Sequence, residues 1–205
     1  MYCDSISNTV IARLPIYLHY LNSLGDDGKN TISSAAIAQA LDMGEVQVRK
    51  DLALVSRAGK PKIGYVVSEL TKHIETALGM GKERKAIIVG AGKLGRALLG
   101  YEGFNEYGLN IIAAFDKKST EREITANNKC VYPISELKGF CTDNGIGIGI
   151  ITVPEAEAQK VCDELTECGI SAIWNFSPVK LKISGDVKLK NENMAASLAA
   201  LVAKM

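Results

Sequence analysis

Residues 86–95 read AIIVGAGKLG, and this stretch decides the fold of the second half of the chain. The four apolar residues 86–89 are typical of a strand that is covered on both faces. The glycines that follow have the spacing G-x-G-x-x-G and precede a helix predicted over residues 93–99. In such a loop Gly90 allows a tight turn, Gly92 lets backbone N–H groups approach a pyrophosphate, and Gly95 lets helix and strand pack closely. The stretch therefore predicts a dinucleotide-binding α/β domain.

An acidic residue ends the next predicted strand, residues 110–115. This residue, Asp116, follows the glycines by about 20 residues, where a ribose-binding acid is expected. A carboxylate there accepts a hydrogen bond from the ribose 2′-hydroxyl and repels a 2′-phosphate, which favours NAD over NADP. Lys117 and Lys118 follow at once, however, and could instead attract a phosphate. A glycine-rich turn that binds nothing is the simpler alternative, but it leaves the position of Asp116 unexplained.

Strands and helices continue to alternate as far as residue 176. An uncharged strand is predicted over residues 146–153, a helix over 155–167 and a strand over 172–176. This alternation is typical of a doubly wound parallel sheet. Such sheets bind ligands at the carboxyl ends of their strands, where the sequence has Thr152, Val153 and Pro154. A proline that merely ends a strand is the alternative explanation of this tripeptide.

The first half of the chain is mostly helical. The elements predicted there are helices over residues 10–24, 35–41, from 45 onward and 68–78, and a strand over 64–67. Short helices followed by a strand pair predict a winged helix-turn-helix, whose third helix is the candidate reader of the DNA major groove. Residues 79–82 read GMGK and are predicted to link the two halves.

Basic residues are concentrated around this third helix. Residues 49–62 hold five basic side chains and one acid, Asp51, a net charge of +4. Such a surface suits contacts to phosphates and base edges. The candidate DNA-binding residues are Ser33, Gln47, Arg49, Lys50, Arg57, Lys60 and Lys62. Either Ser33 or Ser34 can cap the second helix. A solvated helix face, or a protein–protein module, is the competing interpretation, and Asp51 is predicted to cap or pair locally.

Composition excludes several classes of protein. The 205 residues include 24 Lys and Arg against 23 Asp and Glu, and 47% are hydrophobic, as in ordinary globular proteins. No apolar run approaches the roughly 20 residues that span a bilayer. The N-terminus lacks the basic and apolar pattern of a secretory signal. The five cysteines form no C-x-x-C pair, and neither His19 nor His73 is followed three or four residues later by a His, Cys, Asp or Glu. We expect a cytoplasmic protein with no metal and no membrane partner.

Catalytic residues are hard to find in the second half. About 120 residues remain after Lys85, too few for a separate substrate domain, and none of them is histidine. The nucleotide is therefore predicted to be a sensed ligand. A small NAD- or CoA-dependent enzyme with a helical assembly domain is the main alternative. A DNA-binding protein in which the nucleotide only stabilises the fold is a third possibility.

The C-terminal segment predicts a subunit contact. Residues 191–205 form a predicted helix that is apolar nearly all round, with Met194, Leu198, Leu201 and Met205 spaced four, three and four. A terminal helix of this kind on a small domain is expected to pack on a second subunit in a homodimer, which would also match a palindromic operator. Packing over its own domain is the alternative.

In these features the whole chain resembles the family of redox-sensing transcriptional repressors called Rex. The stretches that carry the resemblance are RLPIY (13–17), QVRKDL (47–52), Gly64-Tyr65, residues 89–95, Tyr101, Phe115-Asp116, Thr152-Val153-Pro154 and NFSP (175–178). The resemblance implies a homodimer with a winged-helix domain (1–80), a Rossmann-like domain (81–188) and an exchanged terminal helix (189–205). It also implies that operator DNA is bound when NAD⁺ predominates and released when NADH rises.

The resemblance also extends the set of candidate nucleotide-binding residues, with Tyr101 taking part in the switch near the nicotinamide. The full set is Gly90, Ala91, Gly92, Lys93, Leu94, Gly95, Tyr101, Asp116, Thr152, Val153, Pro154, Phe176 and Pro178. The sequence departs from the family pattern in three places. They are the wing turn (56–62), Asn193 and Met194, where an acid and a larger apolar or aromatic residue are expected, and Glu121, near which the family commonly has a lysine.

Overall fold

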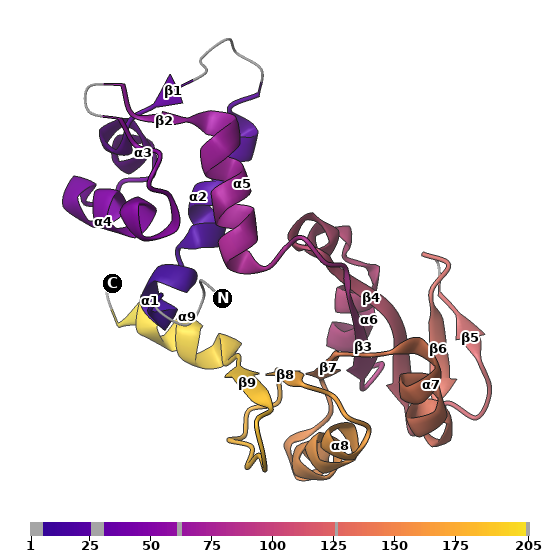
Figure 1. The fold of residues 1–205 in the computed structure, drawn as a ribbon. Coiled ribbons are helices and arrows are strands. Elements are labelled where there is room, and N and C mark those ends of the chain that lie inside the picture. Colours follow the sequence, from indigo (N-terminus) through magenta and orange to yellow (C-terminus); the bar gives the residue numbers. More distant parts are fainter. Residues whose placement is uncertain (1–5, 26–30, 61–62, 126, 204–205) are drawn as a thin grey trace. The chain divides into compact units, whose positions relative to one another are not determined.

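The computed structural model describes residues 6–25, 31–60, 63–125 and 127–203, and the chain divides into two compact units (Figure 1). The first unit is Met1–Lys82 and the second is Glu83–Met205. The division falls at the end of the glycine-containing segment that was predicted to be the linker. Each unit has a hydrophobic core of its own.

The first unit is a set of short helices with a small antiparallel sheet. Its elements are α1 (Asn8–Ile11), α2 (Leu14–Ser23), β1 (Thr31–Ile32), α3 (Ser34–Ala40), α4 (Glu45–Val55), β2 (Tyr65–Val66) and α5 (Val67–Leu78). The two strands pair antiparallel, with Ile32 opposite Tyr65. The core is built from the apolar faces of all four longer helices, including Leu14, Ile37, Leu52 and Leu70, which are fully buried. This is the predicted helix-turn-helix with its strand pair.

Three details of this unit differ from the prediction. The helix expected over residues 10–24 is interrupted, because α1 ends at Ile11 and α2 starts at Leu14 with a proline in its first turn. The strand expected over residues 64–67 has only two residues, since Val67 already begins α5. Its partner β1 carries no alternating pattern that would have revealed it.

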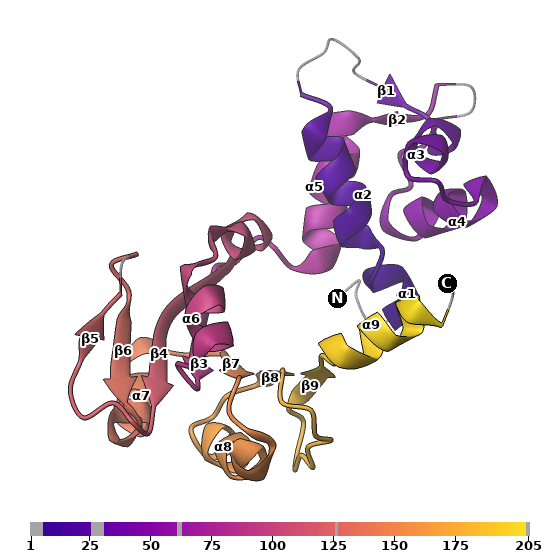
Figure 2. The same ribbon diagram turned by 180° about the vertical axis from the view of Figure 1, so that it is seen from behind.

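The second unit contains a seven-stranded sheet in the order β5-β6-β4-β3-β7-β8-β9 (Figures 1 and 2). The strands are β3 (Arg84–Val89), β4 (Leu109–Asp116), β5 (Glu123–Ile124), β6 (Cys130–Pro133), β7 (Ile148–Ile151), β8 (Ala172–Asn175) and β9 (Lys188–Asn191). All neighbouring pairs are parallel except β5 with β6. The chain order reverses at β3, which pairs with both β4 and β7. This confirms the doubly wound parallel sheet and places its switch point beside the glycine loop.

Helices cover both faces of this sheet. The helical elements are α6 (Lys93–Gly100), the 3₁₀ turns η2 (Glu102–Tyr107) and η3 (Ile134–Glu136), α7 (Leu137–Asn144), α8 (Glu155–Glu167) and α9 (Met194–Val202). One core joins Ile87 and Phe115 to α7 and α8, whereas a second joins Ile88 and Ala114 to Leu99 of α6. Because β3 and β4 are buried on both faces, their sequences contain continuous apolar runs.

The terminal helix starts later than predicted. Residues 188–191 form β9, paired with β8, and helix α9 begins at Met194 with Asn193 as its cap, whose side chain accepts a hydrogen bond from Ala196 N at 2.9 Å. The apolar side chains of α9 are all exposed within the chain: Met194 58%, Leu198 61%, Leu201 60% and Val202 59%. None of the helices in the described ranges combines the length and the apolar character that a membrane span requires.

Candidate functional site

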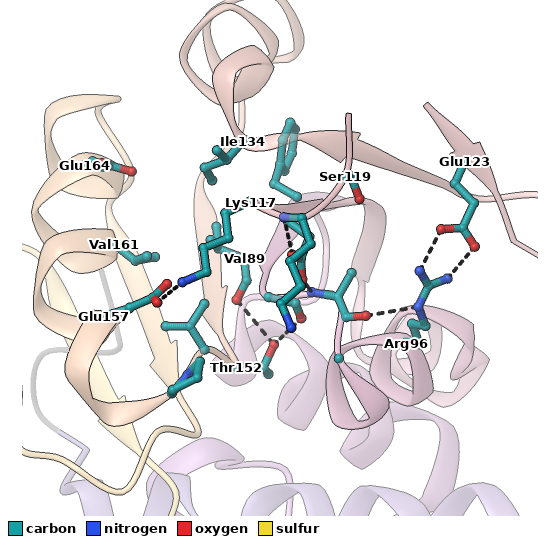
Figure 3. A pocket seen from close by; sticks show the side chains of 18 of the residues that line it. Val89, Arg96, Lys117, Ser119, Glu123, Ile134, Thr152, Glu157, Val161 and Glu164 are labelled. Carbon is teal, nitrogen blue, oxygen red and sulfur yellow. Dashed lines mark hydrogen bonds and ion pairs between the residues drawn. The ribbon is translucent and has the colours of Figure 1, made fainter. Parts of the chain in front are cut away.

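A cavity of about 1180 Å³ opens in the second unit at the carboxyl ends of β3, β4 and β7 (Figure 3). Seven of the predicted nucleotide-binding residues line it: Gly90, Ala91, Gly92, Asp116, Thr152, Val153 and Pro154. They come from three segments that are far apart in the sequence and meet because parallel strands end at the same edge of the sheet. The cavity therefore lies at the switch point that the strand order defines.

The glycines of the loop have distinct structural roles. Gly90 has a φ of +105°, a left-handed conformation that favours glycine. A Cβ at Gly95 would lie 1.9 Å from the carbonyl oxygen of Gly90, so α6 and β3 can approach only because this side chain is absent. At Gly92, by contrast, a Cβ would meet no atom within 4 Å. The space beside Gly92 is thus open toward the cavity, as a phosphate-binding loop requires.

Hydrogen bonds fix the loop from two sides. The Thr152 hydroxyl donates to the Gly90 carbonyl oxygen at 2.6 Å. The carboxylate of Asp116 accepts one hydrogen bond from Ala91 N at 2.7 Å and another from Lys118 N at 2.8 Å. Asp116 therefore holds the loop to the end of β4 while its half-buried carboxylate still lines the cavity.

Two ion pairs on the cavity wall have no counterpart in the sequence-based predictions (Figure 3). Arg96 on α6 forms a two-pronged pair with Glu123 on β5, and Lys117 after β4 pairs with Glu157 in the first turn of α8. Glu157 could have been found, because α8 follows Thr152-Val153-Pro154 directly. Glu123 could not, since β5 has two exposed residues and no periodic pattern.

Six other predicted residues do not line this cavity. They are Lys93, Leu94 and Gly95 in the first turn of α6, Tyr101 after that helix, and Phe176 and Pro178 after β8. Tyr101 is 59% exposed and its ring lies edge-on to Phe104, with centroids 4.9 Å apart. Phe104 contacts Trp174, which contacts Phe176, so Tyr101 and Phe176 are the two ends of one row of aromatic rings. Phe104, Trp174 and Phe176 pack against the core on the α6 side of the sheet.

In the first unit the predicted DNA-binding residues gather around α4. Gln47, Arg49 and Lys50 are exposed on the helix, and Arg57 and Lys60 are exposed just after it. Lys60 exchanges two backbone hydrogen bonds of 2.9 Å with Gly64, which closes the turn of the wing. Ser33 does cap α3: its hydroxyl accepts a hydrogen bond from Ala36 N at 3.1 Å. Lys62 lies outside the described residues.

The prediction that Asp51 caps or pairs locally is wrong. Asp51 is 3% exposed and accepts hydrogen bonds from Arg13 Nε (2.7 Å), Arg13 Nη2 (2.9 Å) and the Tyr17 hydroxyl (2.8 Å), all on or beside α2. Burial opposes ionisation, but the hydrogen bonds from Arg13 and Tyr17 outweigh it and lower the pKa of Asp51. Asp51 thus holds α4 to the start of α2.

The histidines give no sign of a metal centre. His73 Nδ1 lies 2.9 Å from the Ser56 hydroxyl, and His19 is exposed. Within the described ranges, no three His, Cys, Asp or Glu side chains are grouped so that they could hold a metal ion.

Comparisons with known proteins match both units. A family model described as "Putative DNA-binding protein N-terminus" matches residues 5–53, and one described as "CoA binding domain" matches residues 81–179. The chain is 40% identical to the redox-sensing transcriptional repressor Rex of Treponema denticola, over 93% of this chain and 91% of that protein. It is 38% identical to Rex of Carboxydothermus hydrogenoformans, over 96% of this chain and 94% of that protein.

Solved structures give the same match in three dimensions. The chain superposes with a TM-score of 0.90 on a crystal structure of the protein RSP in complex with NAD⁺ and operator DNA, with 34% identity over 97% of this chain and 92% of the other. The TM-score is 0.85 for RSP in complex with NADH, over 98% of this chain and 94% of the other.

Proposed function

The chain belongs to the Rex family of redox-sensing transcriptional repressors, and on that premise we propose that it binds operator DNA and is released from it by NADH. The observation that carries the proposal is the presence, in one chain, of exposed basic side chains on and just after helix α4 and of a glycine-loop cavity with an acid at the position expected for ribose binding. The superposed RSP structures contain NAD⁺ with operator DNA in one case and NADH in the other, which are the two states that the proposal requires.

The cavity residues fit a dinucleotide. The open space beside Gly92 and the N-terminus of α6 would receive the pyrophosphate, and the carboxylate of Asp116 would face the ribose hydroxyls. Gly90, Ala91, Thr152, Val153 and Pro154 would shape the walls. Lys93, Leu94 and Gly95 would support the loop through α6. Tyr101, Phe176 and Pro178 are proposed to act at the nicotinamide end; this part of the proposal rests on the family resemblance.

The ligand is sensed and not consumed, because the relatives are repressors and the chain is not an enzyme. The nicotinamide ring is positively charged in NAD⁺ and neutral in NADH, so a protein can distinguish the two by charge alone. A tenfold preference requires only about 1.4 kcal/mol of differential binding. A preference between two arrangements of the domains then becomes a change in DNA affinity.

In the first unit, α4 is proposed to enter the major groove. Gln47 and Arg49 suit base edges, and Lys50, Arg57, Lys60 and Lys62 suit phosphates, while Ser33 positions the preceding helix. The support is their common exposure around α4 and the wing turn, with Lys62 placed by sequence only. DNA selection from a random duplex pool tests this: recovered sequences should share one palindrome, whereas recovery without enrichment would contradict sequence-specific binding.

We further propose a cytoplasmic homodimer without metal or membrane partners, in which residues 1–80 bind DNA, 81–188 bind NAD(H) and 189–205 join the subunits. The exposed apolar face of α9 supports the dimer, since a helix so apolar is expected to be covered. Exchange of this helix between subunits is the arrangement that the resemblance implies. The cytoplasmic location follows from the need to reach operator DNA.

A further inference from the structure

Arg96 is held between the glycine loop and the edge strand β5. Its Nε donates to the Ala91 carbonyl oxygen at 2.9 Å. Its Nη1 and Nη2 donate to the two carboxylate oxygens of Glu123 at 2.7 and 2.6 Å. Nε, Nη1 and Nη2 of the guanidinium thus all donate to acceptors within the chain. Glu123 binds Nη1 and Nη2 in the two-pronged geometry with which an arginine also binds a phosphate.

This arrangement lies next to the proposed ribose position. Arg96, Glu123 and Asp116 all line the cavity. The pKa of Arg96 is raised, first by its hydrogen bonds to Glu123 and further by the charge of Asp116, so the three groups act on one another. In dinucleotide-binding folds the acid at this strand end binds the 2′-hydroxyl, and an arginine beside it is what accommodates the 2′-phosphate of NADP. Arg96 is therefore the residue most able to admit a 2′-phosphate here.

The charge balance of the region opposes the binding of a 2′-phosphate. Arg96, Asp116 and Glu123 sum to −1, and Lys117 is engaged by Glu157. Of the cavity-lining cations, Lys118 alone has no ion-pair partner within the described part of the chain. Of the two lysines that the sequence suggested could attract a phosphate, only the exposed Lys118 is not engaged in an ion pair among the residues that the structure describes.

We propose that Glu123 is a specificity-determining residue, which occupies Arg96 so that the cavity accepts NAD(H) and rejects NADP(H). The inference rests on the proposed function, in that the cavity must bind NAD(H). It names Glu123, on a strand that no sequence pattern revealed, as the group that discriminates. Asp116 repels the 2′-phosphate, and Glu123 removes the cation that would compensate for this repulsion.

The experiment is a titration of the full chain with NADH and with NADPH, followed by the fluorescence of the reduced nicotinamide at one ionic strength. Wild type should bind NADH about tenfold or more tightly than NADPH. Glu123→Gln should bind NADPH more tightly than wild type does. The ratio of the dissociation constant for NADPH to that for NADH should therefore fall by about tenfold. Adding Arg96→Gln to Glu123→Gln should remove that gain.

A matched control is available in the same unit. Glu136 pairs with Arg122 at 2.9 Å, and neither residue lines the cavity, so Glu136→Gln should leave the ratio at its wild-type value. Glu123→Ala provides a second test if the glutamine variant fails to fold. A ratio that stays at the wild-type value in folded Glu123 variants overturns the inference, as does equal binding of both nucleotides by wild type. Wild type that binds neither nucleotide overturns the proposed function as well.

Discussion

Arg13 and Asp51 are 38 residues apart in the sequence, yet Arg13 Nε lies 2.7 Å from Asp51 Oδ2. The carboxylate is almost fully buried and also accepts a hydrogen bond from the Tyr17 hydroxyl. Its neighbours in sequence, Arg49 and Lys50, are exposed on the other side of α4. One helix thus presents its basic side chains outward while an acid on its inner face fixes it to α2.

Replacing the buried acid should therefore destabilise the first unit. Asp51→Asn removes the negative charge to which Arg13 and Tyr17 donate hydrogen bonds. We expect a loss of about 3 kcal/mol in the free energy of unfolding. Urea denaturation followed by circular dichroism measures it. Glu69→Gln makes the same chemical change at an exposed position of α5 and should have little effect. Equal stability of the two variants would show that the Asp51 pair contributes nothing.

The same group predicts acid sensitivity. The pKa of Asp51 in the folded state lies below its ordinary value of 3.8. The ionised carboxylate therefore stabilises the fold fully when the pH is well above 3.8, and this stabilisation is lost as the pH falls through the folded-state pKa. Wild type should lose stability below about pH 4, and the Asp51→Asn variant should lose less over the same interval. A set of denaturation curves between pH 2.5 and about 6 gives the comparison; parallel losses in both proteins would contradict the prediction.

Tyr17 predicts a loss of stability at the alkaline end. Burial first, and then its hydrogen bond to Asp51, raise the pKa of Tyr17 from 10.0 to about 12. The stability that comes from keeping this hydroxyl neutral is present below pH 10 and is lost as the pH rises toward 12. Tyr17→Phe should show a smaller loss over that interval. The difference in tyrosinate absorbance between wild type and Tyr17→Phe isolates the titration of Tyr17 from that of the other six tyrosines.

Gly92 and Gly95 provide a pair of tests in one loop. Gly95→Ala places a methyl group against the Gly90 carbonyl, and we expect it to cost about 2 kcal/mol of stability. Gly92→Ala meets no atom within 4 Å, so the fold should keep its stability while the methyl group fills space proposed for the pyrophosphate. Its affinity for NADH should fall by about tenfold. Thermal unfolding and nucleotide titration of both variants separate the two roles, and reversed outcomes would refute the assignment.

Lys50 tests the DNA-binding surface. Lys50→Gln should weaken binding to all duplexes and lower the slope of log K against log salt by about 0.9, the share of one phosphate contact. NADH binding should be the same as in wild type, because Lys50 belongs to the other unit. Lys138→Gln, at an exposed position of α7, is the matched control. If both variants bind DNA as wild type does, α4 is not the DNA-contacting helix.

Leu198 tests the role of the terminal helix. Its side chain is 61% exposed in the single chain, and its burial in a dimer would contribute about 2 kcal/mol. Leu198→Asp should therefore shift the protein toward monomers in light scattering at low micromolar concentration. Ser197→Asp introduces the same charge at a polar position of α9 and should remain dimeric. A monomeric wild type would contradict the proposed homodimer.

The parts of the fold that the sequence predicted are those set by local constraints. A strand buried on both faces has a continuous apolar run, and a loop that must approach a phosphate needs glycine, so β3 and residues 90–95 could be predicted. The strands β1 and β5 have two residues each and no periodic pattern. The Arg13–Asp51 and Arg96–Glu123 pairs depend on long-range packing, which spacing along the chain does not reveal.

The most direct test of the central claim is fluorescence polarisation of the full chain on a duplex recovered by selection, titrated separately with NAD⁺ and with NADH. We predict that the complex persists with NAD⁺ and dissociates with NADH at concentrations that saturate the cavity. A complex that responds to neither nucleotide, although both bind, would contradict redox sensing by this chain.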